Sequence, residues 1–90
     1  MIPKHRIPPH PGEILLEEFL VPERMTQSQL APKMGVPVQR VNEIVKGKRG
    51  ITAETALLLS RVWDVAPEMW LNLQATYDLA VARQKMKRAG

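Results

Sequence analysis

A pair of short helix-length segments near the middle of this chain constrains its fold most. The first segment follows Thr26, which has a capping-box pattern with Gln29 three residues later, and it ends at Gly35. The second segment starts near Pro37 and ends at Gly47. Two short helices joined across the sequence GVP are typical of a helix-turn-helix. The spacing therefore predicts this motif at the centre of the fold.

Three further helices are predicted around this pair. One covers residues 11–21, with Pro11 at its first position and an apolar stripe at Leu15, Leu16, Phe19 and Leu20. Thr52 can cap another helix, which is apolar enough to be largely buried. The longest helix opens at Pro67, and its apolar residues recur in steps of three and four. With no strand candidate, the chain is predicted to be all-α with five helices.

The chain is short enough to form one domain. Residues 1–9 contain three prolines and are predicted to form an extended arm, and residues 10–90 are predicted to form the single domain. A domain of this size buries only about 60 to 65% of the surface of its unfolded chain, so apolar surface is often left for a partner. We therefore expect a homodimer.

Composition argues against several classes of protein. The chain has no cysteine, so neither a disulfide framework nor a thiolate zinc site is available. Its longest apolar runs are four residues, and its N-terminus lacks the apolar core of a signal peptide. These features predict a soluble, cytoplasmic protein that does not enter a membrane.

No constellation of catalytic or metal-binding residues stands out. The sequence has no glycine-rich phosphate loop, no paired carboxylates and only two serines, so an enzyme is not expected. His5, His10 and Glu13 can be drawn as a metal site, but histidines beside prolines are more often surface groups, and His10 can simply start a helix. Neither a metal nor a cofactor is predicted.

Positive charge is concentrated in the middle of the chain. Residues 23–50 hold six Lys or Arg against two Glu, a balance of +4 that equals the formal net charge of the whole chain. Residues 1–22 and 51–90 have balances of −1 and +1. A local positive field attracts polyanions, although a solvated basic surface without a partner has the same composition.

The second helix of the motif has one apolar and one polar side. Val41, Ile44 and Val45 form the side expected to be buried. In a helix-turn-helix the other side faces base edges in the major groove, where Gln and Asn pair with adenine, Arg with guanine and Glu with cytosine. Any surface helix also has a polar side, so this pattern alone is weak evidence. The candidate contacts are Val38, Gln39, Arg40, Asn42, Glu43 and Lys46.

Candidate phosphate contacts flank this helix on both sides. Gln27 lies in the first turn of the preceding helix, where backbone N–H groups and an amide can hold a phosphate. Lys46, Lys48 and Arg49 lie at or just past the end of the second helix, where the DNA backbone would run. Together these residues predict binding to double-stranded DNA.

Four segments carry a family resemblance. In order, HPGEILLEEFL, TQSQLAPKMGV, VNEIVKGKRGITAETALLLSR and PEMWLNLQATYDLAVAR resemble the HigA-type antitoxin family, also called virulence-associated protein I, within the lambda-repressor-like helix-turn-helix group. The resemblance covers about residues 10–83. It implies a five-helix domain, a homodimer that represses its own operon, and a partner toxin of the HigB type, a ribosome-dependent mRNA endonuclease.

Two alternatives remain open from the sequence. A stand-alone helix-turn-helix transcriptional regulator without a toxin would have the same DNA-reading residues. A module that binds only proteins would leave the basic residues after the second helix unexplained.

The resemblance also assigns roles by position. Gln27 matches the phosphate-binding glutamine of lambda-like repressors, and Val38, Gln39 and Glu43 match base-facing positions. Two prolines depart from the family pattern. Pro32 falls inside a helix, and Pro37 stands where many lambda-like repressors have a capping Ser or Thr.

Two further surfaces are predicted. The longest helix is expected to form the dimer, and a dimer would bind half-sites roughly one helical turn, about 34 Å, apart. The candidate dimer residues are Trp70, Leu71, Leu73, Tyr77 and Leu79. Glu13, Glu17 and Glu18 are offered as a docking surface for a basic toxin.

Overall fold

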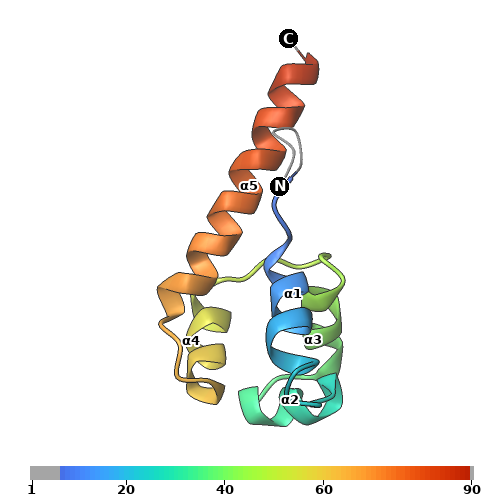
Figure 1. The fold of residues 1–90 in the computed structure, drawn as a ribbon, viewed down its shortest axis with the longest axis vertical. Coiled ribbons are helices and arrows are strands. Elements are labelled where there is room, and N and C mark those ends of the chain that lie inside the picture. The colour runs from blue at the N-terminus through green and yellow to red at the C-terminus, as the bar shows by residue number, and fades with distance from the viewer. Residues whose placement is uncertain (1–6, 90) are drawn as a thin grey trace.

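The computed structural model describes residues 7–89, and its regular elements are all helices (Figure 1). Because α1 and η1 run on as one helix, the described residues form five helices and no strand, which confirms the all-α prediction. Residues 1–6 of the predicted arm lie outside the described residues, and residues 7–10 are not helical. The elements are α1 (Pro11–Ile14), η1 (Leu15–Leu20), α2 (Gln27–Met34), α3 (Val38–Val45), α4 (Ala53–Val62) and α5 (Pro67–Ala89).

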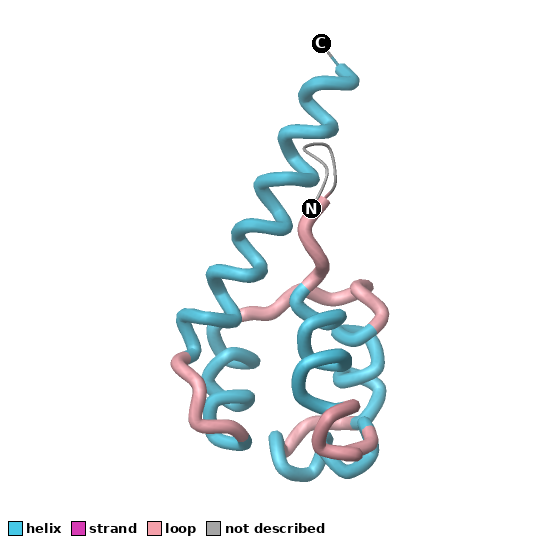
Figure 2. The backbone as a smooth tube through the Cα atoms, in the orientation of Figure 1, coloured by secondary structure: helices cyan, strands magenta, loops and turns pink. Residues whose placement is uncertain are grey.

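The helices form two groups joined by α2 and α5. Figure 1 shows α1, η1 and α3 on one side and α4 on the other, while α5 rises beyond both. α2 packs against α3 and α4, and α5 packs against α4 and α1. The loop after α3 crosses from one group to the other in Figure 2. In the part of the chain that the structure describes, no helix combines the length and the apolar character needed to cross a membrane.

The first helix is wound more widely than an α-helix along η1. The amide of Val21 donates to the carbonyl of Leu16 at 2.9 Å, which is a π-type bond. Residues five apart point about 140° away from each other on an α-helix, and the wider turn of i→i+5 bonding reduces that angle. Leu15 and Leu20 are 0% and 2% exposed. The wide turn therefore places both ends of the predicted apolar stripe in the core.

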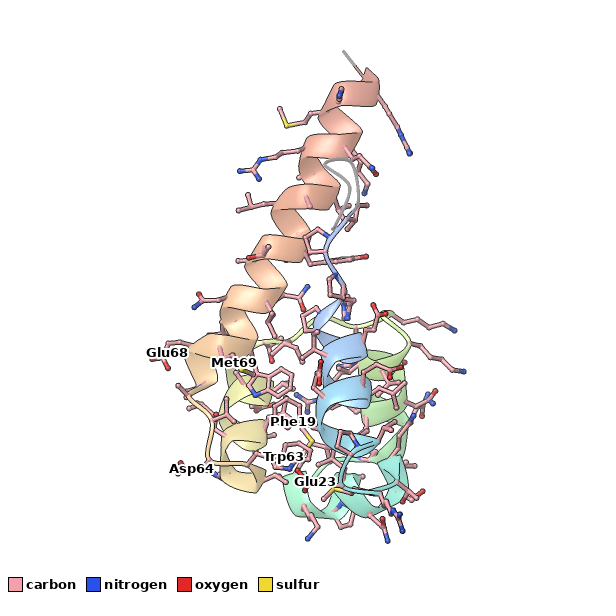
Figure 3. All side chains as sticks on the ribbon, in the orientation of Figure 1. Phe19, Glu23, Trp63, Asp64, Glu68 and Met69 are labelled. Carbon is pink, nitrogen blue, oxygen red and sulfur yellow. The ribbon has the colours of Figure 1, made fainter. Side chains whose placement is uncertain are left out.

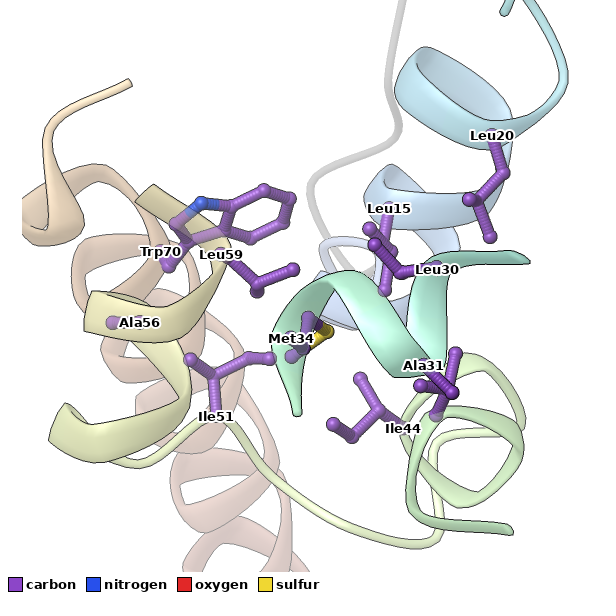
Figure 4. Packing of buried hydrophobic residues seen from close by; sticks show 11 residues of the cluster. Leu15, Leu20, Leu30, Ala31, Met34, Ile44, Ile51, Ala56, Leu59 and Trp70 are labelled. Carbon is purple, nitrogen blue, oxygen red and sulfur yellow. The ribbon is translucent and has the colours of Figure 1, made fainter. Parts of the chain in front are cut away.

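The buried apolar side chains come from every helix (Figure 4). Phe19 packs between Trp63 and Trp70, with ring centroids 4.9 Å and 5.1 Å apart, and Figure 3 shows Phe19 and Trp63 close together between the first helix and α4. Trp70 is completely buried by its own chain. The dimer contact predicted for Trp70 is therefore wrong, because none of its surface is left for a second chain.

Gly12 sets the distance between the first helix and α3. A Cβ atom added at this residue would lie 1.7 Å from the carbonyl oxygen of Ile44. Gly12 is buried, so a side chain has no open space to turn into. Only a glycine lets the two backbones approach this closely, and the approach holds α3 in place.

Candidate nucleic-acid interface

The helix-turn-helix is built by local signals. Thr26 Oγ1 accepts from the amide of Gln29 at 3.0 Å, and Gln29 Oε1 accepts from the amide of Thr26 at 2.9 Å, which confirms the capping box that starts α2. Gly35 ends α2 with a left-handed φ of 73°, and the amide of Val36 donates back to Ala31. These bonds turn the chain sharply from α2 into α3.

Neither proline interrupts the motif. α2 continues through Pro32, which has no N–H group to donate to the carbonyl of Ser28. Both residues lie on the exposed side of the helix, so that carbonyl stays close to water. Pro37 is the N-cap of α3 and makes no side-chain capping bond, as expected from the loss of a Ser or Thr there. Its φ of −64° already suits the entry to a helix.

α3 buries the side that the sequence predicted. Val41 and Ile44 are both 0% exposed, while Val38 is 46% exposed and Gln39 is exposed. An apolar side anchored in the core leaves the opposite side of a two-turn helix facing outward. Val38 and Gln39 are therefore available at the N-terminal end of α3, where a recognition helix meets base edges.

Gln27 and Asn42 are linked across the motif. The amide nitrogen Nδ2 of Asn42 donates to Oε1 of Gln27 at 3.0 Å. The bond uses the acceptor of Gln27 and leaves its NH₂ group able to donate to a phosphate, while Oδ1 of Asn42 still accepts. A candidate phosphate contact and a candidate base contact are thus held together by one hydrogen bond.

Arg40 is turned toward α4. Its Nη2 atom lies 2.9 Å from Oε1 of Glu54 and 2.9 Å from Oγ1 of Thr55, and its Nε atom is buried without a partner. The sequence predicted a DNA contact for Arg40. In the structure its Nη2 atom is engaged within the chain, and the DNA contact stays a prediction. Helical periodicity could not indicate that Arg40 contacts Glu54 and Thr55, because these residues lie 14 and 15 positions further along the chain.

The residues after α3 form a basic turn, which we define as Lys46, Gly47, Lys48 and Arg49. The carbonyl of Glu43 accepts from the amides of Lys48 and Arg49 at 2.9 Å and 3.2 Å, and Gly47 has a left-handed φ of 75°. Lys46 and Lys48 are exposed and form no ion pair within residues 7–89. Arg49 instead places its Nε and Nη2 atoms 3.1 Å from Oε1 of Glu43.

A glutamine that the sequence did not single out fastens the loop after the basic turn. Oε1 of Gln74, on α5, accepts from the amide of Ile51 at 2.7 Å, and its Nε2 atom donates to Asp78. This contact ties Ile51, two residues after the basic turn, to α5. The partners are 23 residues apart, so no local pattern could reveal the contact.

His10 lies where the start of α1, the basic turn and α5 meet. Its Nδ1 atom accepts from the amide of Gly12 at 2.9 Å, and its ring stands edge-on to Tyr77 with centroids 4.9 Å apart. Burial lowers the pKa of His10, and the nearby carboxylate of Asp78 opposes this shift. The capping bond matches the interpretation of His10 as a helix start. No group of residues suited to hold a metal occurs among the described residues.

The remaining predicted surfaces differ in exposure. Leu79 is 52% exposed on α5, whereas Leu71, Leu73 and Tyr77 are half-buried against their own chain. The dimer assigned to this helix stays a prediction. The toxin-docking role also stays a prediction for three exposed acidic residues of the first helix, Glu13, Glu17 and Glu18.

Residues 16–70 match the helix-turn-helix family. The chain is 49% identical over 75 residues to virulence-associated protein I of Dichelobacter nodosus, covering 83% of this chain and 69% of that protein. It is also similar to the solved structure of Pseudomonas aeruginosa antitoxin HigA with the higBA promoter, at 40% identity and a TM-score of 0.87, covering 91% of this chain and 89% of that chain.

A second solved structure, antitoxin GraA in complex with its operator, is 39% identical. Its TM-score is 0.86, and the match covers 99% of this chain and 90% of that chain. The likeness to both structures extends over nearly the whole length of each chain.

Proposed function

Because the chain belongs to the helix-turn-helix family of HigA-type antitoxins, we propose that it is a DNA-binding antitoxin. It binds operator DNA as a homodimer in the cytoplasm, represses its own operon and neutralises a HigB-type mRNA endonuclease toxin, and it performs no catalysis itself. The observation that carries the proposal is the exposed N-terminal end of α3, with Gln27 on one side and the basic turn on the other. That arrangement suits base reading between two phosphate contacts.

The contacts divide by what each side chain can reach. Val38, Gln39 and Asn42 face base edges from α3, and Gln27, Lys46 and Lys48 hold the phosphates that flank it. Phosphate contacts fix the position of the protein on DNA, whereas base contacts select the sequence. Arg40 acts from within the chain by holding α3 to α4 through Glu54 and Thr55.

The first test measures fluorescence anisotropy of the purified protein on two duplexes across a series of salt concentrations. One duplex carries the DNA upstream of its own gene, and the other carries the same bases in scrambled order. We expect a preference of about a thousandfold or more for the upstream DNA, with affinity that falls steeply as salt rises. Equal and weak binding to both duplexes would leave α3 without a reading role.

The toxin half of the proposal needs a separate test, because a stand-alone transcriptional regulator would have the same DNA-reading residues. An adjacent reading frame that encodes a small basic protein is the candidate partner. Expression of that protein alone should arrest growth, and co-expression with this chain should restore it. Growth that is unaffected by the neighbouring protein would favour the stand-alone regulator.

A further inference from the structure

We propose that Glu43 withholds Arg49 from DNA and thereby sets the overall DNA affinity of the protein, instead of reading a base. The proposal rests on the proposed DNA-binding function. It assigns to Glu43 and Arg49 roles different from the base contact and phosphate contact that their positions in the sequence indicate. The observation that carries it is the pairing of these two side chains at the end of α3.

The pair is held by both backbone and side-chain bonds. Nε and Nη2 of Arg49 each lie 3.1 Å from the same carboxylate oxygen of Glu43, so two guanidinium donors face that oxygen. The amide of Arg49 also donates to the carbonyl of Glu43 at 3.2 Å. This backbone bond keeps Arg49 beside Glu43 even while the side chains move. The basic turn, in which Gly47 has a left-handed φ, brings the two residues together.

The pair changes the charge that the basic turn presents to DNA. The side chains are 49% and 34% exposed, and an ion pair in such a position contributes little to folding stability. Its effect is on the electric field, because a carboxylate beside a guanidinium cancels most of the attraction that a phosphate would feel. The basic turn therefore acts on DNA with Lys46 and Lys48, and the third cation is neutralised within the chain.

Removal of the carboxylate should add one phosphate contact. Each such contact releases condensed counterions and makes the slope of log K against log salt more negative by about 0.9. At about 0.15 M salt, one contact corresponds to roughly fivefold tighter binding. A phosphate contact carries no sequence information, so the gain should be the same on any DNA sequence. A base-reading carboxylate would behave differently, because its loss weakens binding to the specific site alone.

The test is a double-mutant cycle with Glu43→Gln and Arg49→Gln, measured by anisotropy on the scrambled duplex and on the upstream duplex across salt. We expect Glu43→Gln to tighten binding about fivefold on both duplexes and to steepen the salt slope by about 0.9. Arg49→Gln alone should weaken binding to both duplexes, because it leaves the Glu43 carboxylate uncompensated beside the DNA, while the double variant should return to the wild-type affinity and slope. Thermal unfolding of each variant checks that the fold is kept.

The matched control is Glu68→Gln, which makes the same change in net charge at the start of α5, on the opposite side of the molecule from α3 (Figures 1 and 3). Equal tightening by Glu68→Gln and Glu43→Gln would reduce the effect to net charge and overturn the proposal. So would a loss confined to the upstream duplex in Glu43→Gln, or a double variant that binds the scrambled duplex more weakly than the wild type and with a shallower slope.

The cycle also separates this proposal from the proposed function. If the wild-type protein shows no preference for the upstream duplex, the operator function is contradicted. The affinities of the four variants for the scrambled duplex still give the coupling between Glu43 and Arg49 in that case. Failure to bind either duplex even at about 50 mM salt, where phosphate contacts are strongest, would contradict both.

Discussion

At the scale of single residues, two contacts place the elements proposed to face DNA, and both involve the start of the first helix. Gly12 allows the close approach of that helix to α3, and His10 caps the helix while its ring lies near Gly47 of the basic turn. Neither residue is a candidate DNA contact. Their substitution should therefore act through stability and through the placement of α3, and each carries a prediction.

Gly12→Ala should destabilise the fold. The added methyl group would overlap the Ile44 carbonyl, so the two backbones must separate, at a cost of about 1 to 3 kcal/mol in the free energy of unfolding. Gly50→Ala is the comparison variant, because its Cβ would lie 3.2 Å from the end of the Gln74 side chain and not against backbone, so we expect a smaller loss there, limited to the Gln74 contact with Ile51. Urea unfolding of both variants measures the difference. Equal losses would show that the close approach at Gly12 does not matter.

His10 predicts a pH dependence of stability. Burial lowers the pKa of His10 in the folded protein below its ordinary value of 6.5, so the unfolded chain binds the proton more readily. The stability linked to neutral His10 is complete above pH 6.5 and is lost as the pH falls from there through the folded pKa. A protonated ring would also lose the Nδ1 acceptor and place a cation at a helix N-terminus.

The comparison is with His10→Asn, which keeps a capping acceptor but does not titrate. The free energy of unfolding in urea, measured at pH 7.5, 6.5 and 5.5, should fall more steeply for the wild type than for the variant. Absolute stability can differ, since the variant loses the Tyr77 contact. If the free energy of unfolding depended on pH in the same way for the wild type and the variant, His10 would not be the source of the pH dependence.

At the scale of elements, the helices that carry the motif were predicted from local signals. The capping box at Thr26 and the left-handed glycine at Gly35 both act within a few residues, so the sequence alone located α2. The π winding of η1 was not predicted, because it depends on the core that receives Leu15 and Leu20. The partners of Arg40 were missed for a related reason, since Glu54 and Thr55 belong to the next helix.

The reading role proposed for α3 predicts a loss of binding that depends on the DNA sequence. Gln39 is exposed near the start of α3, where its amide can pair with a base edge. Gln39→Ala should cost about 1 to 3 kcal/mol of binding free energy on the upstream duplex and little on the scrambled one. Gln84→Ala, on α5, is the matched control. Equal losses on the two duplexes would count against base reading.

At the scale of the whole molecule, α5 is the element that its own chain covers least. Only Trp70 is buried among its 23 residues, and the molecule measures 45 × 27 × 23 Å because α5 extends past the other helices. Leu79 and Ala82 are exposed on this helix. A second copy that packs on α5 would bury this surface, and it would also provide the second α3 that a two-half-site operator requires.

Leu79→Asn should weaken that dimer. Leu79 is 52% exposed in the single chain, and a two-fold interface would lose its apolar contact twice, so we expect the dissociation constant to rise about tenfold or more. Sedimentation equilibrium at micromolar concentrations measures the change. Leu57→Asn is the control, because Leu57 is 55% exposed on α4. Wild-type protein that sediments as a monomer would rule out the dimer.

The sequence by itself determined which segments become helices, where the helix-turn-helix lies and which side of α3 faces outward. Those properties depend on caps, glycines and apolar periods, which act over one or two turns of the chain. Only the tertiary structure decided that Trp70 is core, that Arg40 faces α4 and that Arg49 pairs with Glu43. A long cationic or aromatic side chain can reach several neighbours, and the packing of distant elements selects the one it contacts.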